Sequence, residues 1–166
     1  MRMIPLALPL MLLALAGAAA APSGAGDLSL PPDWERRFIR FATVDDTDRG
    51  MVRHILIDPA SHAGLRAGMP APGGTLLVMA DARARRDAAG RPLRDAAGRF
   101  VAESGWVGIY AQRKDVTRGD WQYAVFDGAG RPRDVSTAAC RACHLQARAA
   151  QDQTFTLWDY AAARGR

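Results

Sequence analysis

The two cysteines of this 166-residue chain stand three positions apart near its end, and a histidine directly follows the second one. The segment is predicted to be a helix that begins at Ser136 or Thr137, so Cys140 and Cys143 point to the same side, with His144 beside them. Four kinds of site use cysteines in this way: a small disulfide, half of a zinc site, a redox pair, or the covalent anchor of a haem.

The first residues have the layout of a secretory signal peptide. Arg2 forms a positive n-region, an apolar run extends from Ile4 to Ala16, and small residues follow. The apolar run is shorter than the roughly 20 residues that a bilayer span needs. We therefore expect cleavage near Ala20 or Ala21, export to the periplasm, and no membrane attachment after cleavage.

The available ligands and the spacing distinguish between the four kinds of site. A structural zinc site needs four ligands, but His54 and His62, the other histidines, are isolated in a predicted strand and a loop. A redox pair usually follows the first strand of a βαβ pattern, which is not found here. A disulfide within one helical turn is strained. Cys140 and Cys143 can instead form thioethers with one porphyrin whose iron His144 binds, so we predict one covalent haem c per chain.

The positive charge of the chain does not indicate a nucleic-acid partner. The formal net charge is +5, but the arginines are scattered among aspartates and glutamates. No nucleic-acid recognition motif accompanies them. We therefore expect no binding to nucleic acid.

The apolar patterning predicts an α+β domain with a mainly antiparallel sheet, an N-terminal helix and a C-terminal helix that carries the cysteines. Asp33 is the predicted N-cap of a first helix over 34–44. The expected strands cover 51–57, 74–81, 100–114 with a break near Ser104, and 121–127. The expected organisation is a signal peptide (1–21), a disordered mature N-terminus (22–32), one haem c domain (33–161) and a tail (162–166).

A short repeat interrupts this pattern, because RDAAGRPL at 86–93 is followed at once by RDAAGRF at 94–100. Two short copies are too few for a repeat protein. Asp and Gly at fixed offsets instead predict two successive turns in a long hairpin loop.

The late position of the cysteines limits how the iron can be ligated. No methionine follows His144, and the last one in the chain is Met79. A sixth ligand would have to come from Met51, Met69, Met79, His54 or His62. Packing or solvent-exposed roles are expected for these residues, so we predict a five-coordinate iron with an open distal side. An open position serves ligand binding or chemistry, whereas a sixth ligand would favour electron transfer.

The order of short motifs resembles the cytochrome P-460 family, which includes the cytochromes called c′-beta. The resemblance extends from about Trp34 to Asp159 and implies a mostly antiparallel sheet, a homodimer, and a five-coordinate haem c with a proximal histidine. Its motifs are a strand with Arg53, Pro-x-Gly-Thr (Pro72, Gly74, Thr75), a basic-Asp pair (Lys114, Asp115), Trp-x-aromatic (Trp121, Tyr123), C-x-x-C-H, and Asp-x-x-Phe-Thr (Asp152, Phe155, Thr156).

The resemblance also implies two groups of proteins that differ on the distal side of the haem. One group oxidises hydroxylamine and has a lysine cross-linked to the haem after Pro-x-Gly-Thr; the other has an apolar pocket and binds small gases such as nitric oxide. The stretch LLVMADARARR has no lysine, and Lys114 is expected to lie at a solvated strand end.

We therefore predict a protein that binds nitric oxide or a similar small ligand, with a distal pocket of Leu77, Met79 and Tyr110. Oxidation of hydroxylamine or another small nitrogen compound is the first alternative. An electron carrier with a sixth ligand is the second. A periplasmic redox partner is also expected.

Overall fold

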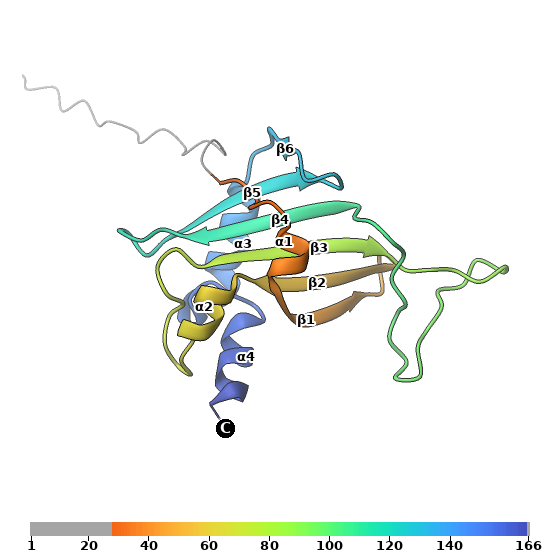
Figure 1. The fold of residues 1–166 in the computed structure, drawn as a ribbon, viewed down its shortest axis with the longest axis horizontal. Helices are drawn as coiled ribbons and strands as arrows, with labels where there is room; N and C mark the ends of the chain where they lie inside the picture. Colours follow the sequence, from red (N-terminus) through yellow and green to blue (C-terminus); the bar gives the residue numbers. More distant parts are fainter. Residues whose placement is uncertain (1–27, 166) are drawn as a thin grey trace, which may run out of the picture.

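The computed structural model describes residues 28–165; the predicted signal peptide and residues 22–27 lie outside the described residues. Six strands form one antiparallel sheet in which each strand pairs with its neighbours in sequence (Figure 1). This confirms the predicted α+β fold, which is mainly β. The strands are β1 (Ile39–Asp46), β2 (Met51–Ile57), β3 (Leu76–Arg83), β4 (Gly108–Lys114), β5 (Trp121–Asp127) and β6 (Pro132–Arg133).

The helices are short and lie at the two ends of the described chain and between β2 and β3. Within residues 28–165, no helix is both long enough and apolar enough to cross a membrane. The helices are α1 (Trp34–Arg37), α2 (Pro59–Gly64), α3 (Ala138–Arg148), the 3₁₀ helix η2 (Ala149–Gln151) and α4 (Leu157–Arg164).

The first helix is much shorter than the predicted span of 34–44, and that prediction is wrong. α1 ends at Arg37, and β1 begins at Ile39. The apolar spacing suits a helix, but the segment is rich in Ile, Phe, Thr and Val, which favour strands when a partner strand is present. Asp33 is not an N-cap in the expected sense, because its φ is 57° and its side chain caps no amide.

The two faces of the sheet are covered by different parts of the chain. Successive residues of a strand point to opposite faces. Val78 packs with Trp34 and with Leu28, which is buried although its segment was predicted to be disordered. Leu77 packs with Leu157 of α4. We call the face of Val78 the α1 face and the face of Leu77 the α4 face.

Residues 84–107 form a long arm between β3 and β4 that projects beyond the sheet (Figure 1). The arm contains the two successive turns that the repeat predicts. Asp87 and Asp95 each accept hydrogen bonds from the amides two and four residues later, all at 2.9 Å. Gly90 and Gly98 occupy the equivalent left-handed positions, with φ of 79° and 77°. Each copy of the repeat is therefore one self-contained turn.

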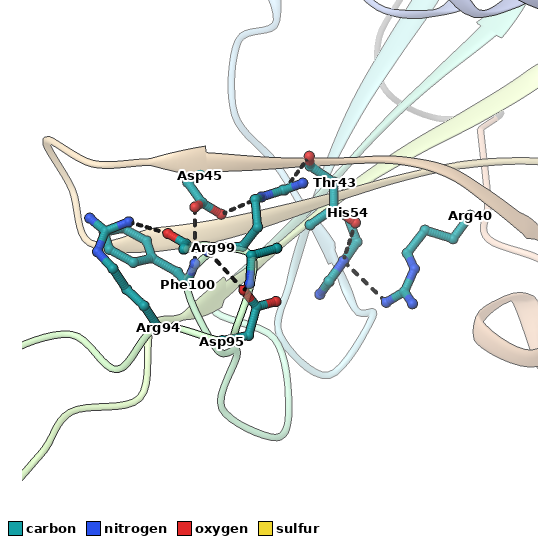
Figure 2. Close-up of polar contacts among 10 residues, drawn as sticks. Arg40, Thr43, Asp45, His54, Arg94, Asp95, Arg99 and Phe100 are labelled. Carbon is teal, nitrogen blue, oxygen red and sulfur yellow. Dashed lines mark hydrogen bonds and ion pairs between the residues drawn. The ribbon is translucent and has the colours of Figure 1, made fainter.

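The second turn of the arm packs against the edge strand β1 (Figure 2). The amide of Phe100 donates to Oδ2 of Asp45 at 2.9 Å, and Nε of Arg99 lies 3.6 Å from Oδ1 of the same carboxylate. Arg99 also donates to the carbonyl of Thr43, and the guanidinium of Arg94 lies over the Phe100 ring. These contacts cover an edge strand that would otherwise present unpaired backbone groups.

His54 is buried on the α1 face beside this edge. Its Nδ1 accepts hydrogen bonds from the guanidinium of Arg40 at 3.3 Å and from the hydroxyl of Thr43 at 3.2 Å (Figure 2). Burial lowers the pKa of His54 below its usual value, and the charges of Arg40 and Arg99 lower it further. The folded protein therefore favours the neutral imidazole.

We expect the free energy of unfolding to decrease on acidification from about pH 7 to about pH 5, and His54→Gln to reduce this decrease. In the unfolded chain His54 takes up a proton near pH 6.5, whereas the folded chain keeps it neutral to lower pH. Between the two pKa values the unfolded state binds more protons, so acid favours it. Urea unfolding at several pH values measures the effect. An unchanged pH dependence in His54→Gln would contradict the prediction.

Candidate functional site

Helix α3 carries both cysteines and the histidine. Cys140 is half-buried, Cys143 is exposed, and both are free thiols. The helix begins without a strong cap: the hydroxyl of Ser136 lies 3.4 Å from the amide two residues later, and Thr137 makes no capping bond. His144 is half-buried at the next position. The three-residue spacing places both thiols on one side of the helix, where a single group can react with both.

The imidazole of His144 is oriented by a hydrogen bond to the backbone. Its Nδ1 lies 2.7 Å from the carbonyl oxygen of Gln153. A carbonyl can only accept, so Nδ1 carries the proton and donates it. In the neutral ring the other nitrogen, Nε2, then has the lone pair, and this tautomer can ligate a metal through Nε2. The ring also makes edge contacts with Tyr123 and Phe155, at centroid distances of 5.3 and 4.8 Å.

The carbonyl that holds His144 belongs to a short segment after α3, residues 149–156, which we call the proximal loop. Asp152 and Gln153 have φ of 51° and 56°. Non-glycine residues rarely adopt this left-handed conformation, which costs about 1–3 kcal/mol each. The amide of Gln153 donates to the carbonyl of Arg148 at 2.8 Å. Two strained residues in sequence persist only where the surroundings hold them.

Three separate segments hold Asp152 in place. Its carboxylate accepts a hydrogen bond from the amide of Ala71 at 2.8 Å and forms an ion pair with Lys114. The indole Nε1 of Trp121 donates to its backbone carbonyl at 2.9 Å. The proximal loop is therefore tied to the segment before β3, to the end of β4 and to the start of β5.

Lys114 is not at a solvated strand end, so that prediction is wrong. The residue is 6% exposed, and its Nζ lies 5.4 Å from the centroid of the Trp121 ring. The adjacent Asp115 faces the other way and accepts hydrogen bonds from amides of the β4–β5 turn. The partner of Lys114, Asp152, comes from a distant part of the sequence, which is why the sequence alone suggested exposure.

Tyr123 lies next to His144 and has an unusual hydroxyl. The oxygen is buried and has no hydrogen-bond partner within residues 28–165. Burial raises the pKa of Tyr123 to about 12, and the neighbouring Cys140 contributes in the same direction. The phenol therefore stays neutral and serves mainly as a packing surface for the imidazole.

The predicted distal residues all lie on the α4 face, but they are not equivalent. Met79 and Tyr110 are directly paired across β3 and β4, and both are half-buried. Strand pairing and alternation place them on the face of Tyr123 and therefore of His144. Leu77 is buried in the core beneath α4. The structure thus brings Met79 and Tyr110 together and uses Leu77 for packing.

The other candidates for a sixth ligand have other surroundings. His54 lies on the α1 face, away from α3. His62 is hydrogen-bonded to a tyrosine hydroxyl of α4 at 2.8 Å. Met51 is buried at the start of β2, and Met69 is exposed in the loop between α2 and β3.

The residues of α3 and the proximal loop fit a covalently bound haem. Two thiols share one side of the helix, and an imidazole has its Nε2 free. Apolar surface is exposed beside them, because Leu145 and Phe155 are 45% and 37% exposed. The family model described as Cytochrome P460 matches residues 31–156. The chain belongs to the cytochrome P460 family.

Membership of the cytochrome P460 family implies a covalent haem, and Cys140 and Cys143 are consistent with its attachment. None of the curated proteins that were compared with the chain matches it.

Sequence reasoning missed the contacts that orient the histidine in this cytochrome P460 domain. The resemblance marked Asp152, Trp121 and Lys114 as motif residues but did not assign them a role. The carbonyl of Gln153 has no signal in a side-chain pattern, since every residue has a carbonyl.

We expect Tyr123→Phe to leave the free energy of unfolding of the haem-free chain unchanged or to raise it. The hydroxyl has no partner among the described residues, so its removal relieves an unsatisfied polar group. Trp121→Phe is the matched comparison, because it removes a hydrogen bond to Asp152 and buried ring volume, and should cost about 1–3 kcal/mol. Urea unfolding measures both. A larger loss in Tyr123→Phe than in Trp121→Phe would refute this account.

Proposed function

We propose that the chain carries one haem c and binds a small neutral ligand, such as nitric oxide, at the iron. Cys140 and Cys143 form the thioethers, and His144 is the axial ligand through Nε2. The observation that carries the proposal is the 2.7 Å hydrogen bond between Nδ1 of His144 and the carbonyl of Gln153, which makes Nε2 the nitrogen with the lone pair in the neutral imidazole. When bound, the haem supplies an iron that can take a small ligand at its other axial position.

The surroundings of the other histidines and methionines support an iron without a second protein ligand. His54 is on the opposite face of the sheet, and His62 is engaged by Tyr160. Met51 is buried in the core. Met79, in the middle of β3 on the α4 face, is the candidate that most needs a direct test.

The strand residues around Met79 support a preference for neutral ligands. Met79 pairs with Ile55 on one side and with Tyr110 on the other, and Tyr110 pairs with Val125. All four side chains are half-buried, so this central strip of the α4 face is apolar and only partly covered. Apolar surroundings disfavour a charged ligand. The hydroxyl of Tyr110 is the group in this strip that can donate a hydrogen bond to a bound diatomic.

The state of Lys114 supports ligand binding over oxidation of hydroxylamine. It is the only lysine of the chain, and its ammonium is paired with Asp152. A lysine cross-link to the haem would require this ammonium to leave a buried ion pair. Removing one partner from such a pair leaves an uncompensated buried charge.

We also propose that residues 1–21 direct export to the periplasm, where haem is attached to proteins of this kind. A homodimer and a periplasmic redox partner complete the proposal. Export is supported by the positive, apolar and small-residue order of the leader.

We expect the wild-type chain, produced with the c-type haem maturation machinery, to keep its haem on a denaturing gel. The double variant Cys140→Ala/Cys143→Ala should keep none, because both thioethers are lost. The wild-type ferric absorption spectrum should be high-spin, and the ferrous form should change its Soret band when titrated with nitric oxide. A haem that is retained without the two thiols, or a ferrous form that does not respond to nitric oxide, would contradict the proposal.

We expect Met79→Leu to leave the ferric and ferrous spectra unchanged, because the swap conserves volume and removes only a sulfur that does not ligate the iron. Absorption spectroscopy of both proteins at one pH is the measurement. A low-spin wild type that becomes high-spin in Met79→Leu would show that Met79 is a ligand. That result would favour the electron carrier over the ligand-binding protein.

A further inference from the structure

The Lys114–Asp152 ion pair joins the end of β4 to the proximal loop, and it is nearly closed to solvent. The two side chains are 7% and 10% exposed. Placing two charges inside a protein is unfavourable unless their geometry is good and their remaining hydrogen-bonding atoms are satisfied. Here the second carboxylate oxygen accepts from the amide of Ala71 at 2.8 Å. The pair therefore acts as a fixed point and not as a mobile surface contact.

This fixed point lies one residue before the carbonyl that holds the proximal imidazole. Asp152 and Gln153 both have left-handed backbone conformations. Gln153 then directs its carbonyl to Nδ1 of His144 at 2.7 Å. A strained backbone relaxes when its anchors are removed. Loss of the Lys114–Asp152 pair should thus let the peptide unit of Gln153 rotate and lengthen its bond to His144.

We propose that Lys114 and Asp152 are positioning residues for the axial ligand, and that through the Gln153 carbonyl they set the reduction potential of the iron. The inference rests on the proposed function, since it requires His144 to ligate a haem iron. A hydrogen bond from Nδ1 to a strong acceptor makes the imidazole a better electron donor. A better donor stabilises the ferric state, so the intact pair holds the potential low.

A second anchor supports a positioning role and not merely a stabilising one. Trp121 donates from its indole to the backbone carbonyl of Asp152 at 2.9 Å, while Lys114 Nζ lies over the same indole ring. The main chain and the side chain of Asp152 are therefore held independently. The indole alone holds only the carbonyl of Asp152, so loss of the ion pair still lets the next peptide unit turn.

The test compares the wild-type haem protein with the double variant Lys114→Met/Asp152→Asn. The double variant removes one positive and one negative charge, so the net charge near the iron does not change. Asn at 152 can still accept from the amide of Ala71. We expect the reduction potential to rise by an amount that corresponds to a tenfold change in the reduction equilibrium, about 59 mV for one electron. Lys114→Gln/Asp152→Asn, which also conserves net charge, serves as a second variant if the first double variant does not accumulate.

Amide hydrogen exchange reports on the loop itself. The amides of Gln153 and Thr154 donate to the carbonyls of Arg148 and Gln151 at 2.8 and 3.1 Å. We expect both amides to exchange faster in the variant. Because exchange is measured separately from the potential, it shows whether the loop has been loosened in the protein whose potential is measured.

The chain offers a matched control in the pair of Arg99 with Asp45. Like Asp152, Asp45 accepts a backbone amide with one carboxylate oxygen and faces a cation with the other. This pair fixes the arm on β1 (Figure 2), and the side chains of both residues bond to the arm and to β1. The double variant Arg99→Gln/Asp45→Asn also conserves net charge. In this variant the amides of the arm should exchange faster, and the reduction potential should not change.

The outcomes separate this inference from the function on which it rests. Faster exchange of the loop with a raised potential, in the Lys114/Asp152 variants and not in the control, supports the inference. A loosened loop with an unchanged potential overturns it, as does an unchanged loop or an equal shift in the control. A wild type that keeps no haem on a denaturing gel refutes the proposed function itself, and the inference with it.

Discussion

The buried contact between Lys114 and Asp152 is the interaction on which the arrangement of the cysteine helix depends. Within residues 28–165, α3 has no fully buried residue, so it gains little from packing its own side chains into a core. Its C-terminal end is held where the proximal loop returns to the sheet, and Arg141 near its start pairs with Asp120 at 3.5 Å. An isolated helix of this length is marginal in water. The ion pair and the Trp121 hydrogen bond therefore help to hold α3 in place, whereas most helices are held by packing of an apolar face.

This arrangement fits a helix whose apolar partner is a cofactor. Leu145 and Phe155 are exposed beside His144, while the middle of the α4 face has a strip of half-buried apolar side chains. On the α1 face, by contrast, the equivalent strand positions are fully buried, as Val78 and Ile109 are. The α1 face is thus fully covered, whereas the strip on the α4 face is open enough to contact another group, which gives this face a specific use. Under the proposed function, that use is to cover the haem that membership of the cytochrome P460 family implies.

Local patterns in the sequence were sufficient for much of the fold. The strands β2, β3 and β5 and the helix of Cys140 follow from periodicity and spacing, and the repeat correctly predicted the tandem turns. The helix predicted over 34–44 failed because pairing with β2 outweighed the local pattern. The role of Lys114 could not be found, because its partner is 38 residues away and a strand-end lysine beside an aspartate is usually exposed. The hydrogen bond from His144 to the Gln153 carbonyl could not be predicted either. This carbonyl points to His144 because the backbone of Asp152 and Gln153 is left-handed.

The tandem turns of the arm have a consequence for how such a chain can change in length. Each Asp-Ala-Ala-Gly-Arg unit satisfies its own backbone through one carboxylate and one glycine, so it needs nothing from the core. The last unit is tied to the edge strand β1 through Arg99 and Phe100. A change in the number of copies would rearrange the bonds that join Arg85, Leu93 and Val101, while the ladder between β3 and β4 lies outside the arm. The arm is a modular segment in which gene duplication can act while the strands that face His144 keep their pairing.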